Sequence, residues 1–468
     1  MISLPIEYLH LETGVLPVFL AMLFWVQLGR TREIGYYTRS GRKQLFCLVS
    51  GFLLLTAVFG IFLFNVSPLL AVELAAGCTL SLLHPVNALC FFVHLMYLRP
   101  WEIMTNNVLL LALPRLLAFL CIFSWLLHPD QHGKPTRSTV RGLLVLLVFS
   151  GWLFLSTFQS PHVAESQADW FRTYFKSLVV LMMGVFFIES EKSIREFELT
   201  FVISALALMV VGYYQFRTGT TNAGRLESVG MFGDPNDLAA VVIMAIPFAL
   251  VPVFNKTAGL TGQIAGVLFT AFSMLVIWYT KSRGAMLAVV MQALTALSLR
   301  RSSHKGFKMA LLVGLLGGGY FIALHAIPRT SEEMQESSES RITYWKAAVN
   351  MAIHHPFLGV GFDQYPDNYE HYASGTIYEW GRRTAHSSWF LAFAESGIPG
   401  GLLYVSFFLI ALRTAWRNRR RWPAQLCALA GYGTAMSFLS HTYSLYFYLL
   451  SGLILASDAF SKRTDGGH

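Results

Sequence analysis

Two apolar runs decide the fold: TGQIAGVLFTAFSMLVIWY at 261–279 and GAMLAVVMQALTALSL at 284–299, with TKSR between them. Each run is long enough, or nearly so, to cross a hydrocarbon core of about 30 Å as an α-helix. Runs of this kind recur from residues 13–29 to residues 442–456 of the 468-residue chain. The sequence therefore predicts an all-α, polytopic transmembrane helical bundle.

Composition supports this class and excludes others. Hydrophobic residues make up 54% of the chain and charged residues only 13%, which excludes a soluble globular protein. The formal net charge is +9, but the basic residues lie mainly in short loops between apolar runs. Basic residues in such loops set the orientation of the spans, so we predict a bilayer-embedded protein that does not bind nucleic acid.

Counting the apolar runs gives about 12 to 15 spans. The other predicted spans are 44–64, 67–83, 87–98, 106–127, 140–158, 173–188, 197–216, 237–254, 306–327, 388–412 and 423–439. Residues 67–98 form either one long helix or two helices broken at His84-Pro85. Two are required if the basic loops at 30–43, 134–141, 192–195, 300–308 and 413–421 are all to be cytoplasmic.

With this orientation, the only long loop, residues 328–387, lies outside the cytoplasm. A loop of sixty residues in a compact protein is usually functional. We expect it to carry a short helix that lies along the membrane, begins at a Ser340 cap and ends at His355-Pro356. The apolar face of this helix is predicted to consist of Ile342, Trp345, Val349 and Ala352.

Three polar side chains are predicted on the outer side near the membrane boundary: Arg283, Arg341 and His386. Each has an ordinary explanation, as an interfacial anchor, a solvated helix residue and a polar cap, respectively. Together they suit chemistry on a lipid-linked pyrophosphate. Arginine binds phosphate oxygens bidentately, and a neutral imidazole accepts the proton of an attacking hydroxyl.

Four motifs carry a family resemblance. HSSWFL at 386–391, followed by ESGIPG at 395–400, resembles the signature of the O-antigen ligase and polymerase superfamily of bacterial envelope glycosyltransferases. The other three also resemble family patterns and occur in the same order: FGDPN at 232–236, KSRGA at 281–285, and RITYWKAA with HPFLGVG at 341–361. The matches extend from about residue 230 to the C-terminus, whereas the first 200 residues offer only hydropathy.

The resemblance implies two regions: N-terminal transmembrane helices at 1–216 and an O-antigen ligase-like transmembrane region at 217–468, which includes the loop 328–387. It also implies a metal-independent, inverting glycosyltransferase without a cofactor. Such an enzyme transfers a glycan from undecaprenyl pyrophosphate to an acceptor hydroxyl on the outer face of the bacterial inner (cytoplasmic) membrane. The family's catalytic histidine falls on His386, and its diphosphate-binding arginines fall on Arg283 and Arg341.

The acceptor stays open. A sugar of lipopolysaccharide would make the protein a ligase, and the end of another lipid-linked chain would make it an O-antigen or exopolysaccharide polymerase. A protein hydroxyl would make it an O-oligosaccharyltransferase. A transporter of the same lipid-linked glycan and a non-catalytic scaffold are the rival classes, and a transporter would more often show internal repeats and midplane sites.

Several further residues are given both a functional and a structural interpretation. Lys281, Arg382 and Arg383 either add positive charge around the diphosphate or are solvated loop charges. Glu395 lies nine residues beyond His386 in sequence, too far along a helix to orient the imidazole, so we expect it to serve helix packing. No established metal-ligand spacing such as H-E-x-x-H occurs, and we predict no metal site.

Overall fold

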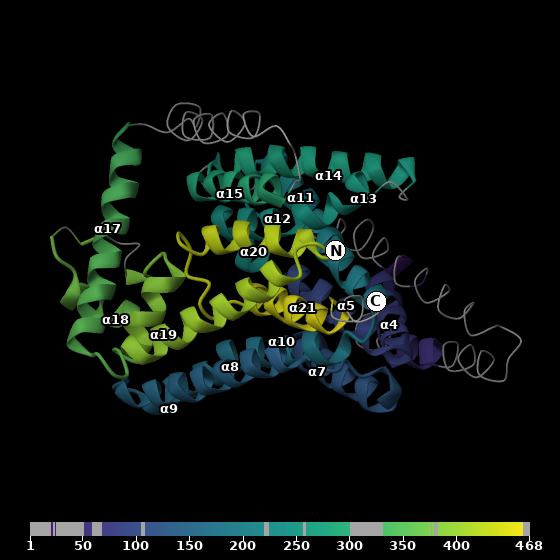
Figure 1. Cartoon of the computed structure of the whole chain (residues 1–468), viewed down its shortest axis with the longest axis horizontal. Coiled ribbons are helices and arrows are strands. Elements are labelled where there is room, and N and C mark those ends of the chain that lie inside the picture. The colour runs from purple at the N-terminus through teal and green to yellow at the C-terminus, as the bar shows by residue number, and fades with distance from the viewer. Residues whose placement is uncertain are drawn as a thin grey trace, which may run out of the picture. The chain divides into compact units, whose positions relative to one another are not determined.

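The computed structural model describes residues 20, 21, 24, 51–58, 68–103, 108–219, 224–255, 259–299, 331–375, 377–378 and 382–461 (Figure 1). These residues form helices, turns and loops without a β-strand, so the predicted all-α class is confirmed. The predicted spans at 306–327 and, for the most part, at 13–29 and 44–64 lie outside the described residues. The helices pack into two units: Met1–Gly133 with Phe187–Leu238, and Lys134–Phe186 with Ala239–His468. The predicted boundary between the two sequence regions, at residue 216, was placed by the positions of the motifs and not by helix packing. It stays a prediction.

The first unit confirms that two helices cover residues 67–98. Its helices are α4 (Pro68–Leu83), α5 (Pro85–Leu98), α6 (Pro100–Ile103), α7 (Val108–Leu127) and α11 (Glu191–Thr218). The break lies at His84, whose side chain accepts a hydrogen bond from the backbone N–H of Val86 at 3.3 Å, and Pro85 begins the second helix. Because α4 and α5 pack against each other, the chain reverses here, as the charge pattern predicted.

The second unit contains the helices that bear three of the four motifs, whereas the FGDPN motif and α12 up to Leu238 belong to the first unit. Its helices are α8 (Arg137–Ser156), α9 (Val163–Asp169), α10 (Phe175–Phe187), α12 (Pro235–Ala249), α13 (Val251–Phe254), α14 (Leu260–Tyr279), α15 (Arg283–Leu299), α17 (Ser331–His354), α18 (Tyr365–Tyr372), α19 (Ser388–Arg417), α20 (Pro423–Ala435) and α21 (Leu445–Ser461). The most extensive packing joins α15 to α20, α8 to α19, and α17 to α19.

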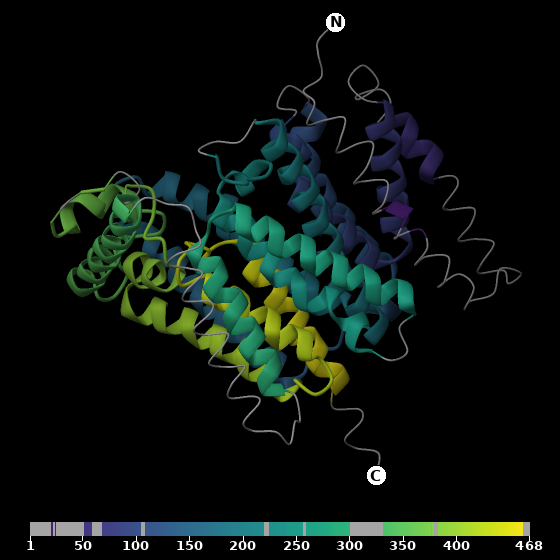
Figure 2. The same cartoon turned by 90° about the horizontal axis from the view of Figure 1, so that it is seen from above.

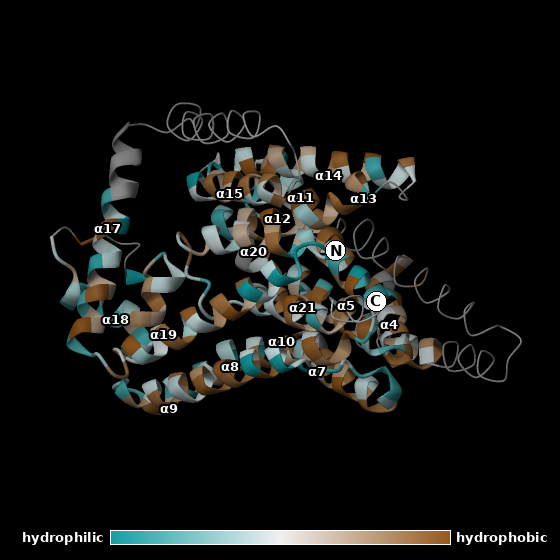
Figure 3. Cartoon of the chain, in the orientation of Figure 1, coloured by the Kyte–Doolittle hydropathy of each residue, from teal (hydrophilic) through white to brown (hydrophobic). Residues whose placement is uncertain are grey.

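Many of these helices have the length and composition of membrane spans. Among the described residues, six segments qualify: Arg137–Gln159, Val163–Phe187, Glu191–Thr218, Pro235–Phe254, Leu260–Tyr279 and Ser388–Arg417. Five shorter apolar helices accompany them, and Figure 3 shows hydrophobic residues along most of α14. The chain is therefore a multi-pass membrane protein, as the hydropathy pattern predicted.

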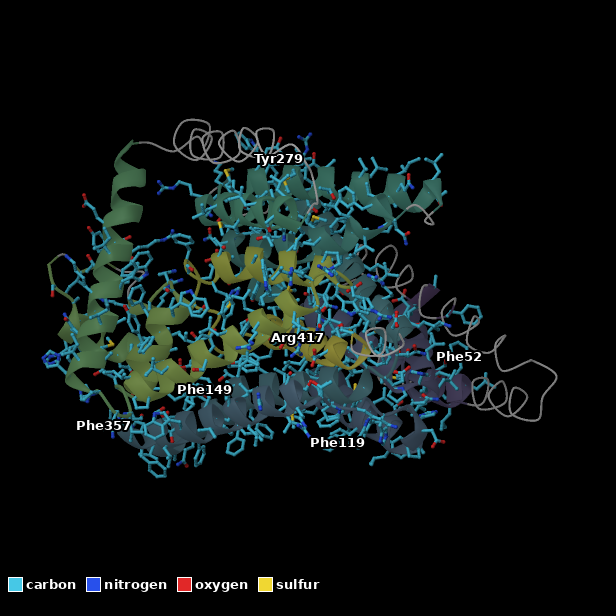
Figure 4. All side chains as sticks on the ribbon, viewed as in Figure 1. Phe52, Phe119, Phe149, Tyr279, Phe357 and Arg417 are labelled. Carbon is cyan, nitrogen blue, oxygen red and sulfur yellow. The ribbon has the colours of Figure 1, made fainter. Side chains whose placement is uncertain are left out.

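The inner end of the second unit is held by a buried carboxylate. The Asp458 side chain on α21 accepts hydrogen bonds from Thr136 Oγ1 at 2.5 Å, from Asn418 Nδ2 at 3.2 Å and from the Arg417 guanidinium. It thus joins the start of α8 to the ends of α19 and α21, all of which are predicted to be cytoplasmic. Figure 4 labels Arg417 near the centre of the view and Phe357 at its lower left.

The long loop carries a longer helix than the sequence predicted. Helix α17 has 24 residues and begins at Ser331, so Ser340 lies inside it and is not its cap. It ends at His354, as the His355-Pro356 pair predicted. Figures 1 and 2 place α17 and α18 at the end of the unit where α19 begins. In Figure 1, α17 runs crosswise to α8 and α19. That α17 lies along the membrane stays a prediction.

The predicted apolar face of α17 was also wrong in part. Ile342 is 49% exposed and Val349 is 40% exposed. Ala352 is buried as predicted, but the other apolar residues that α17 buries are Tyr344, Ala347, Ala348 and Met351, which recur at helical spacing. Two alanines let the neighbouring helix approach closely, and this is why the less hydrophobic face is the buried one.

Two of the sequence motifs meet at a kink in α19. Gly397 has φ 69° and ψ −173°, a conformation that is nearly restricted to glycine, and a Cβ there would lie 2.3 Å from the carbonyl oxygen of Phe357. Gly359, with φ 68°, lies on the loop side of this contact, and it is about as close to the backbone of α19 as Gly397 is to the backbone of the loop. The backbone N–H of Val360 donates to the carbonyl of Ala394 at 2.9 Å, and that of Ile398 donates to the carbonyl of Pro356 at 2.8 Å.

The same kink is fastened to α8. The indole N–H of Trp152 donates to the carbonyl of Ser396 at 2.9 Å and to that of Phe357 at 3.2 Å. Carbonyls released by a helix kink must find such partners in a membrane protein. The HPFLGVG and ESGIPG motifs therefore fasten the outer loop to the spans.

Candidate active site

A short connection between α20 and α21 organises the end of the second unit that is predicted to be extracytoplasmic. Residues 436–444 fold over the start of α19, where Ser388 makes four hydrogen bonds to them. Its N–H donates to the carbonyl of Met436 at 2.9 Å, and its hydroxyl donates to that of Leu439 at 2.6 Å. The hydroxyl also accepts from the N–H of His441 at 2.8 Å, and the Ser388 carbonyl accepts from Thr442 Oγ1 at 2.8 Å. The 436–444 connection is thus fixed beside the HSSWFL motif.

His386 stands two residues before this junction in a strained backbone conformation. Its φ is 48°, in the left-handed region that few residues other than glycine adopt. The imidazole packs against the Tyr344 ring of α17, with centroids 5.3 Å apart and an interplanar angle of 35°. Burial raises the pKa of the Tyr344 phenol, so the imidazole faces a neutral ring. Strain of this kind is retained where the surroundings enforce it, and it is concentrated at functional sites.

Arg341 lies one turn before Tyr344 on α17, so the two side chains share a face of this helix. The guanidinium carbon lies 5.6 Å from the centroid of the Phe438 ring, which belongs to the 436–444 connection. This is a cation–π contact.

Gly284, the neighbour of Arg283 on α15, approaches the same ring. Ser282 caps this helix, its hydroxyl accepting from the N–H of Ala285 at 3.4 Å, and Arg283 is the first residue of the helix. At Gly284, an added Cβ would lie 3.2 Å from three atoms of Phe438. Phe438 is therefore in contact with both segments that carry the predicted diphosphate-binding arginines. Their roles stay predictions, but the structure brings their segments together.

The three additional cations differ among themselves. Lys281 is half-buried, has φ 52° and sits in the turn that leads to Arg283. Arg382 and Arg383 are exposed, and Arg382 Nε lies 2.5 Å from the Glu370 carboxylate of α18. An exposed pair of this kind contributes little to stability. Of the three, only Lys281 lies beside one of the predicted diphosphate-binding arginines in the chain.

Glu395 has the structural role that its spacing from His386 predicted. Its carboxylate is buried and accepts from the N–H of Tyr365 at 3.2 Å and from the Tyr443 hydroxyl at 2.7 Å. Since Tyr365 is the first residue of α18, the carboxylate caps that helix. Glu395 thus ties α18 and the 436–444 connection to α19.

The DPN turn at 234–236 is explained by capping. Asp234 Oδ1 accepts from the backbone N–H of Asn236 at 2.7 Å and from its amide at 2.8 Å, at the start of α12. Among the described residues, no three histidine, cysteine or acidic side chains gather as metal ligands would. His355 Nε2, for instance, hydrogen-bonds to the Tyr372 hydroxyl at 2.8 Å.

Two residues at the site were not identified from the sequence. Phe438 lies in a predicted span, with no pattern to distinguish it from other apolar residues there. Trp345 was predicted as part of the apolar face of the loop helix, with no assigned role at the site. Its ring instead stacks on Phe390 at 5.4 Å and lies 6.4 Å from Phe438, so other aromatic rings pack against it. The buried indole nitrogen of Trp345 has no hydrogen-bond partner in the described part of the chain, and neither has the Ser387 hydroxyl.

Comparison with known proteins agrees with the motif order. Residues 68–257 match a family of unknown function, and residues 267–405 match the O-antigen ligase family. The second match contains Lys281, Arg283, Arg341, His386 and the kinked part of α19. No curated protein has significant sequence similarity to the chain. Residues 267–405 of this multi-pass membrane protein are therefore an O-antigen ligase family region, as the motif order predicted.

Proposed function

We propose that the protein transfers a glycan from undecaprenyl pyrophosphate to an acceptor hydroxyl on the outer face of the bacterial inner membrane. One observation carries the proposal. The segments that bear His386, Arg341 and Arg283 come from three separate parts of the chain and converge on Tyr344 and Phe438 at one end of the second unit. That end is also the one that the basic loops predict to be extracytoplasmic.

The reaction assigns a role to each group. The acceptor oxygen attacks the anomeric carbon of the donor sugar, and the bond from that carbon to the pyrophosphate oxygen breaks with inversion. His386 takes the proton of the attacking hydroxyl. Arg283 and Arg341 stabilise the charge that develops on the departing diphosphate, because their fixed guanidinium groups require no reorganisation.

Arg283 lies at the N-terminus of α15, whose helix dipole also favours a bound anion. As the first residue of α15, it lies where the backbone N–H groups of the helix point outward and carry partial positive charge. An arginine there opposes the helix dipole unless an anion is bound nearby. A diphosphate bound at this position would interact favourably with both.

The test separates lipid-linked from acceptor-linked glycan on gels, from cells that express the wild type or His386→Ala at matched membrane levels. We expect the variant to accumulate undecaprenyl-linked donor and to form product about 10² to 10⁴ times more slowly. His354→Ala is the matched control, because that imidazole is exposed on α17 and bonds only to its own helix, at the carbonyl of Asn350.

The form of the stranded donor identifies the acceptor class. Full-length lipid-linked chains in the His386→Ala cells would indicate a ligase, and single repeat units would indicate a polymerase. Wild-type product levels in His386→Ala would remove the general-base role and favour transport or scaffolding.

A further inference from the structure

The indole of Trp345 carries a buried donor that the proposed reaction does not yet use. It lies four residues after Arg341 on α17, so both side chains project from one face of the helix. Its N–H is shielded from solvent and has no hydrogen-bond partner among the residues described. A buried donor without a partner is unfavourable, and in a native structure it requires an explanation.

Packing accounts for the ring of Trp345 but not for its nitrogen. The ring stacks on Phe390 at an interplanar angle of 21° and lies 6.4 Å from the Phe438 ring at 44°. The guanidinium carbon of Arg341 also lies over Phe438, 5.6 Å from the centroid of its ring. The indole and the guanidinium therefore share one aromatic support. A phenylalanine could stack on Phe390 without burying a polar group, so the ring contacts alone do not explain the N–H.

We infer that the Trp345 N–H is a third donor to the diphosphate of the lipid-linked substrate, beside the Arg341 guanidinium. This inference rests on the proposed function. A neutral donor suits this position because it binds a phosphate oxygen without adding a buried charge that would need a partner when the site is empty. Phe438 positions both groups.

The experiment measures the affinity of the detergent-solubilised full-length protein for undecaprenyl pyrophosphate by isothermal titration calorimetry. Trp345→Phe keeps an aromatic six-membered ring and removes the N–H together with the five-membered ring of the indole. We expect it to bind the probe roughly tenfold more weakly, the cost of one hydrogen bond to a charged group. Its melting temperature without the probe should fall less than that of Trp389→Phe, because the loss of ring packing is partly offset by the removal of a buried donor that has no partner.

Trp389→Phe is the matched control. The Trp389 N–H already donates to Ser437 Oγ at 3.0 Å, so removing it should lower the melting temperature and leave the affinity within about twofold. A merely structural role of Trp345 predicts that Trp345→Phe, too, keeps its affinity for the probe within about twofold of the wild type, and that result would overturn the inference.

Arg341→Gln separates the two proposals. If Arg341→Gln loses affinity and Trp345→Phe binds like the wild type, only the inference about Trp345 fails. If the wild type does not bind the probe, or Arg341→Gln binds it equally well, the diphosphate site itself is wrong, and the inference about Trp345 falls with it.

Discussion

At the scale of single residues, the position of the His386 imidazole depends on Tyr344. The left-handed backbone of His386 fixes where its side chain begins, and the Tyr344 ring covers one side of the imidazole. No motif in the sequence indicates this pairing. Tyr344 occurs in the same RITYWKAA block as Arg341, but the pattern alone does not show which residue of the block touches the histidine.

Substitution of Tyr344 tests whether its ring holds the imidazole. Tyr344→Leu should lower the rate of transfer at saturating donor about tenfold, because an aromatic contact of this kind contributes about 0.5 to 1.5 kcal/mol. Tyr344→Phe keeps the ring and should stay within about twofold of the wild type. Equal losses in both variants would show that the hydroxyl, not the ring, is what matters.

Sequence alone could identify some residues at the site but not others. His386, Arg283 and Arg341 stood out because charge near a membrane boundary is costly and because they fall in ordered motifs. Phe438 did not, since an aromatic residue at the end of a span is expected whatever its contacts. Its importance follows only from the fold, which brings α15 and α17 to the same connection.

At the scale of elements, the kink in α19 is the feature that holds the outer loop to the spans. A glycine at 397 is required both by its φ and ψ and by the nearby carbonyl of Phe357. The turn at 355–361 and the kink fit each other, and Trp152 of α8 bonds to a carbonyl on each side.

Gly397→Ala should therefore lower the free energy of unfolding by about 2 to 4 kcal/mol, the sum of backbone strain and a displaced carbonyl. Thermal unfolding in detergent measures the change. Gly151→Ala in α8 is the control, because a Cβ at Gly151 meets nothing within 4 Å and an alanine favours the helix. A melting temperature unchanged by Gly397→Ala would mean that the kink is not rigid.

The ends of helices were predictable where a proline interrupts the chain. The break at His84-Pro85 and the stop at His355-Pro356 follow from proline, which cannot continue a helix in the preceding turn. The start of α17 was missed by nine residues because SEEMQESSE, at 331–339, is polar throughout and shows no apolar periodicity. Its glutamates and methionine favour a helix by propensity, but propensity alone is a weak signal.

At the scale of the whole molecule, the second unit has a stabilising polar cluster and a candidate active site at different ends. The Asp458 cluster holds α8, α19 and α21 together at one end, and the converging arginines and histidine lie at the other. The antiparallel order of successive helices was predictable from the basic loops. Each polar cluster joins segments that the positive-inside rule assigns to the same side of the membrane.

Asp458→Ala should destabilise the protein by about 2 to 3 kcal/mol while leaving the transfer rate per folded molecule unchanged. The loss is less than that for a pair buried on both sides, because the Arg417 side chain is 44% exposed. Melting temperature and activity normalised to folded protein test this together. A fall in normalised activity would show that the two ends are coupled.

The most direct test of the central claim uses the purified protein in proteoliposomes with a glycan-linked undecaprenyl pyrophosphate donor and the host cell's acceptor fraction. The measurement is the release of free undecaprenyl pyrophosphate over time, which transfer produces and transport does not. We predict release by the wild type, a rate reduced about 10² to 10⁴-fold in His386→Ala, and no change in His354→Ala. Release that is undiminished in His386→Ala, or absent in the wild type, would contradict the account.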